Sequence, residues 1–315
     1  MRAMSFGRTI RKQLTQWGMR GGLRLTRRWS NGSLQRLGRV VAAMGRATPP
    51  LRRMLVRNVA AALGEAPPDV DRVFFRSAGR WIDLLLAVDH RGLDASGALE
   101  RFELDGSVEV LEAAHRLGRG VVLLSPHLFG FEIGAGVINR RVCPVVGLQR
   151  EGRQAWREGL KDRWYRQAGY PVVRRPRRAS AASDAWRCLE VLRSGRALGL
   201  TPDVIVKPER GERVSLLGRE VSLSPGAMLL ARWSGAPVVS CIGREREDGR
   251  VTLCFSGPIE VDGGGEARAA AGAALQRWCA ELEAELRARP GYWMQWLDKR
   301  WSEVWASPPG EGRAG

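Results

Sequence analysis

The amino end of the sequence lacks acidic residues. Its first 64 residues carry fourteen arginines and lysines, and the first acid is Glu65. The whole chain of 315 residues has a formal charge of +18. Such a charge attracts polyanions, namely nucleic acid, anionic lipid headgroups or an acidic protein. Composition alone does not choose among these partners.

Long apolar runs are also missing. No segment approaches the ~20 apolar residues that a membrane-spanning helix needs. The first 30 residues are basic but lack the apolar stretch of a secretory signal. We therefore expect a protein on the cytoplasmic side that is peripheral or monotopic if it binds a membrane.

The sequence lacks the motifs of metal and nucleotide sites. None of its five cysteines forms a CxxC pair, and most lie inside apolar runs, which predicts buried free thiols in a reducing compartment. We find no GxSxG elbow, no P-loop and no GxGxxG after a strand. We expect no metal and no cofactor.

Strand-like and helix-like segments alternate from residue 102 onward. This alternation predicts an α/β fold, with a mixed, mostly parallel central sheet flanked by helices. The segment 250–255 is predicted as a strand at the sheet edge. The expected strands are 102–105, 121–124, 142–148, 171–173, 197–201, 214–217, 220–223, 237–242 and 250–255.

Two basic amphipathic helices are predicted before this domain, at about 34–44 and 51–63, separated by Thr48-Pro49-Pro50. Such a pair lies in a bilayer interface or forms an ordinary bundle face with solvated arginines. Residues 1–30 read as a surface-lying amphipathic segment or a partly disordered arm. We divide the chain into a membrane-associating extension (1–66), an α/β domain (67–305) and a disordered tail (306–315).

The chain is organised around residues 120–136, GVVLLSPHLFGFEIGAG. A short apolar run ends at Ser125-Pro126 and is followed by His127 and, five residues later, Glu132. Residues at this spacing lie roughly 140° apart in a regular helix. For the two side chains to meet, His127 must lie in a loop and Glu132 in the first turns of the next helix.

Chance supplies such a pair about one time in three, since the chain has three histidines and 33 acids in 315 residues. The position of His127 after a buried strand therefore carries more weight than the spacing. A neutral imidazole held by a carboxylate is a competent general base for a hydroxyl nucleophile. The alternative is a histidine satisfied within the core.

Other polar residues also follow predicted strands. Asp203 follows the strand 197–201, and Arg150 and Arg153 follow the strand 142–148. Ligands of open α/β sheets bind beyond the carboxyl ends of the strands, so these residues are candidates for the same crevice. Arginine suits an anionic or carbonyl ligand. The alternative for Asp203 is an ordinary aspartate in a turn, and the alternative for the two arginines is surface charge without a ligand. A basic run nearby is either solvated or receives phosphates: Arg174, Arg175, Arg177 and Arg178.

Tryptophans crowd the carboxyl end beside Lys299 and Arg300. Tryptophan is favoured at membrane interfaces, where one side is apolar and the other wet, and it is equally suited to a protein core. The tryptophans in question are Trp293, Trp296, Trp301 and Trp305.

Several blocks, in order, resemble the bacterial lipid A biosynthesis acyltransferases, which add the late acyl chains and belong to the HX4D/E acyltransferases. The resemblance runs from about Leu34 to Trp301. The blocks are RRMLVRNVAAALGE, SPHLFGFE, VVGLQRE, the stretch from TPDVIVKPERG to GAPVVS, and YWMQWLDKRW.

The resemblance implies that His127 is the general base and that Glu132 orients it. It also implies that Arg150 and Asp203 line the site, and we predict Arg153 and Arg219 as further substrate-binding residues.

The chain departs from the family pattern at several positions. Phe131 stands where the family often has tryptophan, and Asp298-Lys299 where it usually has His-Arg. DVIVKPERG replaces an Asp-rich turn. These changes bear on the choice of substrate more than on the chemistry.

The implied reaction moves an acyl chain from a thioester of acyl carrier protein or CoA to a hydroxyl of a lipid A-type glycolipid. It would take place at the cytoplasmic face of the inner membrane, held there by anionic lipids. Alternatives within the fold use a phospholipid, a mannosylated lipid or an aryl-polyene-type lipid as acceptor. Two alternatives are not acyltransferases. One is a basic nucleic-acid-binding protein, for which no recognised motif appears, and the other is a catalytically inactive membrane scaffold.

Overall fold

The computed structural model describes residues 21–152, 154–178 and 180–307. The predictions for residues 1–20 and for most of the 306–315 tail lie outside the described residues. The helices before the sheet include α2 (Asn31–Ala47), α3 (Pro49–Leu63), α4 (Val70–Arg91) and the short α5 (Ala98–Arg101).

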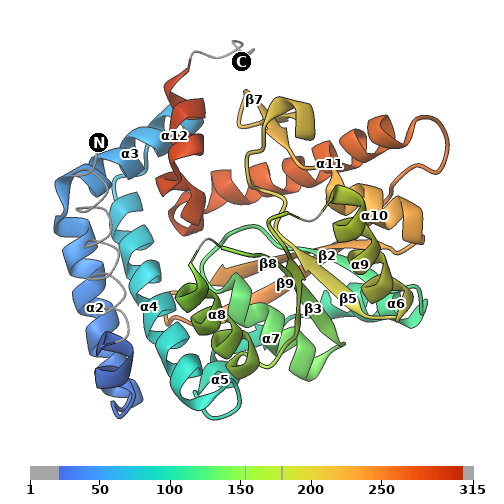
Figure 1. The fold of residues 1–315 in the computed structure, drawn as a ribbon. Coiled ribbons are helices and arrows are strands. Elements are labelled where there is room, and N and C mark those ends of the chain that lie inside the picture. Colours follow the sequence, from blue (N-terminus) through green and yellow to red (C-terminus); the bar gives the residue numbers. More distant parts are fainter. Residues whose placement is uncertain (1–20, 153, 179, 308–315) are drawn as a thin grey trace, which may run out of the picture.

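A seven-stranded sheet forms the centre of the molecule (Figure 1). Its order is β1-β9-β8-β2-β5-β3-β4, and all neighbours are parallel except β8 and β9. This confirms the predicted α/β fold. The strands are β1 (Phe102–Leu104), β2 (Val121–Leu124), β3 (Val145–Arg150), β4 (Val172–Arg175), β5 (Ala197–Leu200), β8 (Val238–Glu245) and β9 (Val251–Ile259). The hairpin of β6 (Glu212–Leu216) and β7 (Arg219–Leu223) stands apart from the sheet.

The prediction that residues 250–255 form a sheet edge is wrong. β9 lies between β8 and β1, and Phe102 of β1 pairs with Val251. Its inward face is buried at Leu253 and Phe255. The strand that covers β9 is three residues long and comes 149 positions earlier, so no local pattern around β9 predicts it.

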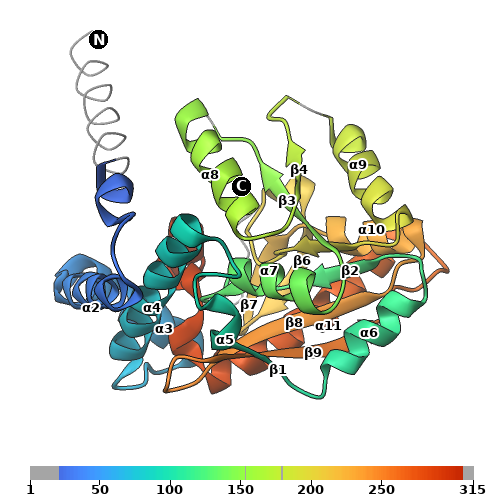
Figure 2. The ribbon, with the colours of Figure 1, turned by 90° about the horizontal axis from the view of Figure 1, so that it is seen from below.

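Helices cover both faces of the sheet. Side chains alternate along β2, so Val121 and Leu123 enter one core cluster while Val122 and Leu124 enter the other. Connections between parallel strands are right-handed. Connections that move along the sheet in opposite directions therefore place their helices on opposite faces. The first face is covered by α6 (Val108–Arg116) and α7 (Phe131–Arg141), and the second by α9 (Ala181–Arg193), α10 (Gly226–Ser234) and α11 (Ala267–Ala288). In Figure 2, α8 (Ala155–Gln167) and α9 lie on either side of β3 and β4.

The amino-terminal helices pack tightly on the domain. Helix α2 crosses α4 so closely that a Cβ on Gly38 would lie 2.4 Å from the carbonyl oxygen of Gly79. Helix α3 contributes Leu55 and Val59 to the same core as the sheet. It is joined to the carboxyl end, because the Asn58 amide donates to the Trp296 carbonyl over 2.8 Å.

The carboxyl-terminal tryptophans are buried, so of the two alternatives left open by the sequence they take the place in the protein core. Trp293, Trp296 and Trp301 have no exposed surface, and Trp305 is 3% exposed. They belong to the main core and touch one another edge to face or stacked. Trp293 lies between the short helices η2 (Pro290–Tyr292) and η3 (Met294–Leu297), Trp296 lies in η3, and the other two lie in α12 (Lys299–Ala306).

The five cysteines are free, as predicted, and all except the half-buried Cys254 are buried. Within the described part of the chain, no helix is long and apolar enough to cross a bilayer.

Candidate active site

His127 lies in the loop between β2 and α7, and Glu132 is the second residue of α7, as the sequence predicts. Gly130 caps the helix with φ of 91°. This left-handed conformation costs glycine little and lets the loop turn directly into the helix.

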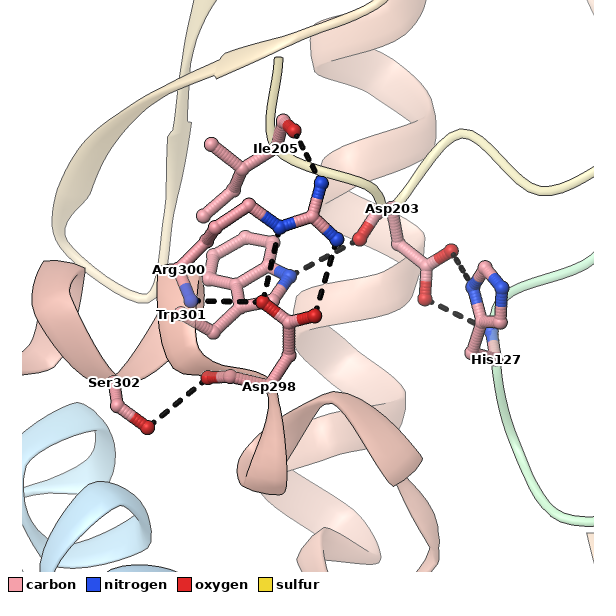
Figure 3. Close-up of polar contacts among 7 residues, drawn as sticks. All are labelled: His127, Asp203, Ile205, Asp298, Arg300, Trp301 and Ser302. Carbon is pink, nitrogen blue, oxygen red and sulfur yellow. Dashed lines mark hydrogen bonds and ion pairs between the residues drawn. The ribbon is translucent and has the colours of Figure 1, made fainter. Parts of the chain in front are cut away.

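The sheet register brings His127 to Asp203. In the parallel pair of β2 and β5, each residue faces the one 76 positions later, as in Leu124 and Leu200. His127 and Asp203 have the same separation, three residues beyond those strand ends. The His127 Nδ1 lies 2.6 Å from the Asp203 Oδ1 (Figure 3).

Asp203 is fully buried and receives several hydrogen bonds. Its Oδ2 accepts the backbone N–H of His127 and the indole N–H of Trp293, both over 2.8 Å. These donors compensate the buried carboxylate oxygens for the loss of water.

The sequence analysis expects Glu132 to orient the His127 imidazole, but in the structure Asp203 makes this contact. Among the described residues, no hydrogen bond joins Glu132 to His127. Glu132 lines the same cavity, half-buried. Burial raises the pKa of Glu132 to about 7, against the opposing positive charges of His127 and Lys161. Near neutral pH this carboxyl therefore exchanges a proton.

The pKa of His127 is raised above its ordinary value of 6.5. Burial is the largest influence and lowers it, but the charge and hydrogen bond of Asp203 and the charge of Glu132 together outweigh burial. The charge of Arg300 acts in the lowering direction. With Nδ1 engaged by Asp203, Nε2 is the ring nitrogen left for a ligand.

A cavity of about 540 Å³ opens beside His127. Glu132, Ala135 and Ile138, spaced three apart on α7, line one wall. The volume lies within the range of small-ligand sites. Glycines from four elements widen its inner part: Gly134 of α7, Gly147 of β3, Gly199 of β5 and Gly243 of β8. Leu123, Val145 and Leu253 give it an apolar surface.

Cationic side chains also line this cavity. They are Arg150 at the end of β3, Lys161 of α8 and Arg175 of β4. Arg175 pairs with Asp184, and Lys161 lies 3.2 Å from Glu158. Arg150 is exposed and makes no ion pair with any described residue. The cavity thus combines an apolar interior with positive charge.

The other predicted site residues lie elsewhere. Arg153 is outside the described residues. Arg219 does not line the cavity, and its guanidinium lies 3.5 Å from the Ala61 carbonyl of α3. Of the basic run, only Arg175 lines the cavity.

Sequence reasoning missed the roles of Trp293, Trp301 and Arg300. The indole N–H of Trp301 donates to the Asp203 carbonyl over 3.1 Å, and the Arg300 guanidinium donates to the Ile205 carbonyl over 3.0 Å. Their position in the YWMQWLDKRW block was the one available signal, but it says nothing about which side chain they reach.

No group of three or more His, Cys, Asp or Glu side chains in the described residues is arranged to hold a metal ion.

A model of one protein family, described as bacterial lipid A biosynthesis acyltransferase, matches residues 8–303. The chain belongs to this family. Because it belongs to the lipid A biosynthesis acyltransferases, the protein is an acyltransferase. This family agrees with the resemblance of the sequence blocks. A search of curated proteins found no match.

Asp203→Asn is expected to lower the pKa of His127. The substitution removes the Asp203 charge, which raises this pKa, and leaves burial, which lowers it, so the pKa of His127 should fall. NMR titration of histidine-labelled protein measures the change, with the His127 signals assigned from His127→Gln. An unchanged His127 pKa in the asparagine variant would contradict the pairing.

Proposed function

We propose that the protein transfers an acyl chain from a thioester to a hydroxyl of a lipid A-type glycolipid, with His127 as general base. The observation that carries this proposal is the His127–Asp203 pair at the cavity. A base held by a buried carboxylate keeps one tautomer and leaves Nε2 facing substrate. Family membership supports the acceptor class.

The acceptor oxygen attacks the thioester carbonyl while His127 Nε2 takes its proton. The C–S bond then breaks, and the imidazolium returns the proton to the leaving sulfur. The thioester is already activated, so no acyl-enzyme is required. Backbone N–H groups at the start of α7 and the Arg150 guanidinium are the candidate donors to the developing oxyanion.

Glu132 takes a second role in this proposal. Its carboxyl shares the cavity with His127, and its charge favours the imidazolium. When ionised, it stabilises the positive charge that forms on the ring as the acceptor loses its proton. The general base is thus oriented by Asp203 and stabilised in its charged form by both carboxylates.

The acyl chain of the donor occupies the glycine-widened interior, and the cationic side chains receive phosphate. Apolar burial contributes about 0.8 kcal/mol for each methylene, so an apolar cavity discriminates by chain length. Phosphate is present on the prosthetic arm of an acyl carrier protein, on CoA and on a lipid A precursor. Arg150, which makes no described ion pair, is the first candidate to bind it.

Purified protein is expected to lose transfer in His127→Ala while remaining folded. General-base catalysis contributes about 10² to 10⁴ in rate, so the loss should be at least of that order. The assay offers acyl carrier and CoA thioesters with a lipid A precursor, and in parallel a phospholipid and a mannosylated lipid. Unimpaired turnover in His127→Ala would refute the mechanism, and transfer to another acceptor alone would refute the acceptor.

Ala135→Leu should shorten the preferred acyl chain. Ala135 is half-buried and lines the cavity between Glu132 and Ile138 on α7. A leucine there occupies space that the distal methylenes would fill, so the rate ratio of long to short donors should fall about tenfold. Ala182→Leu, on the exposed start of α9, is the matched control. An unaltered chain preference would place the acyl chain elsewhere.

Helix α2 supplies a surface for anionic membrane. Val40 is 54% and Met44 65% exposed on one stripe of this helix, beside the exposed Arg36 and Arg39. Apolar side chains flanked by arginines suit the boundary between headgroups and acyl chains. The same basic surface without base-reading motifs is the basis of the nucleic-acid alternative.

Val40→Ser with Met44→Ser should release the protein from anionic vesicles, and Arg36→Gln with Arg39→Gln should weaken binding by about 1 kcal/mol per arginine. Co-sedimentation at several salt concentrations measures both. Leu117→Ser, an equally exposed apolar residue on α6's end, is the control. Binding of DNA in a shift assay with no binding to vesicles would favour the alternative.

A further inference from the structure

The carboxyl-terminal segment is paired with the loop that carries His127. The backbone N–H of Met294 donates to the His127 carbonyl over 2.9 Å, and that of Phe129 donates to the Tyr292 carbonyl over 3.2 Å. Leu128 and Trp293 form an antiparallel bridge between them. The backbone from the His127 carbonyl to the Phe129 amide is therefore held by residues more than 160 positions away.

The same segment also holds Asp203. Trp293 donates its indole N–H to the carboxylate, and Trp301 donates its own to the backbone carbonyl of the same residue. One tryptophan thus fixes the side chain and the other fixes the main chain. Both are fully buried, so water does not replace either donor.

Arg300 fastens the chain two residues beyond Asp203. Its guanidinium donates to the Ile205 carbonyl and forms two bonds with Asp298, of 3.1 and 3.0 Å (Figure 3). Asp298 in turn caps α12 by accepting the backbone N–H of Arg300 over 2.8 Å. Asp298 stands, with Lys299, where the family usually has His-Arg, so the Asp298 side of this contact departs from the family pattern.

We propose that Trp293, Trp301 and Arg300 form a clamp that positions the Asp203–His127 pair for proton transfer. We call these three residues the carboxyl-terminal clamp. The inference rests on the proposed function of His127 as general base. The three residues of the clamp are positioning residues. They act on His127 through Asp203 or through their charge, and they do not contact the substrate.

Electrostatics give the clamp a second effect. The positive charge of Arg300 opposes the charges of Asp203 and Glu132 at His127. The other ionisable groups of the described residues around the same cavity are Arg150 of β3, Lys161 and Tyr165 of α8, Tyr170 before β4, Arg175 of β4 and Cys241 of β8. None of these belongs to the clamp, so changing the clamp leaves them in place.

The tryptophan cluster contains its own control. The indole nitrogen of Trp305 is buried and has no hydrogen-bond partner in the described residues. Its ring stacks on that of Trp301 at 5.4 Å between centroids. Replacing Trp305 by phenylalanine changes the same apolar cluster without removing a bond to Asp203.

The test compares Trp293→Phe with Trp305→Phe. Trp293→Phe should lower kcat roughly ten- to a hundredfold, as loss of an outer partner of a site does, with the KM of both substrates unchanged. Removing a donor from the Asp203 carboxylate leaves more of its negative charge to act on the imidazole, so the pKa of His127 should rise. Trp305→Phe should change neither quantity.

Arg300 gives an independent arm. Arg300→Gln should raise the pKa of His127, because a lowering charge is lost, and Arg300→Lys should restore it. The pKa is read by NMR titration without substrate, and the melting temperature of every variant is measured beside it.

Equal losses in Trp293→Phe and Trp305→Phe, following their melting temperatures, would reduce the clamp to a structural role and overturn the proposal. An unchanged kcat and His127 pKa in Trp293→Phe would overturn it as well. If His127→Ala retains full transfer, the proposed function fails instead. The NMR titration still tests whether the clamp sets the pKa of His127, because it is measured without substrate.

Discussion

The site depends on one buried negative charge. The Asp203 carboxylate has no exposed surface, and such a charge is costly to bury unless donors surround it. The loop after β2 supplies two of them, the backbone N–H and the imidazole of His127, and the carboxyl end supplies the Trp293 indole. Removing any donor leaves part of this charge unpaired, so the three segments hold one another in place.

Distant parts of the chain support that arrangement. Asn58 of α3 donates to the Trp296 carbonyl and to the Ser302 hydroxyl, both over 2.8 Å, which anchors the carboxyl-terminal segment from behind. The basic amino-terminal helices thus pack on the domain with one side and expose the other to solvent. Leu55 and Val59 face the core, while the exposed side of α2 carries the surface proposed for membrane.

The cavity separates two kinds of chemistry. Its interior is apolar and widened by glycines, while Arg150, Lys161 and Arg175 contribute positive charge. Glu132 lines the same cavity, and its raised pKa of about 7 follows from burial that the nearby cations only partly offset. A site of this kind suits a ligand with a long apolar chain and an anionic group.

Much of the fold could be predicted from local pattern. The strand 121–124 and the helices near 181–192 and 267–287 were predicted within a residue or two of their observed ends, because their apolar spacing and glycine or proline stops act locally. The placement of β9 and the burial of Trp293 could not be predicted in this way. Both depend on which distant segment covers them.

Sequence alone determined the strand–loop–helix unit with His127 in the loop and Glu132 in the helix, since turn residues and helix periodicity are local properties. It also indicated Asp203 as a residue at a strand end. Only the tertiary structure decided which carboxylate holds the imidazole. That choice follows from the pairing of β2 with β5, whose register carries His127 to Asp203, and from the tryptophans that make a buried aspartate stable there.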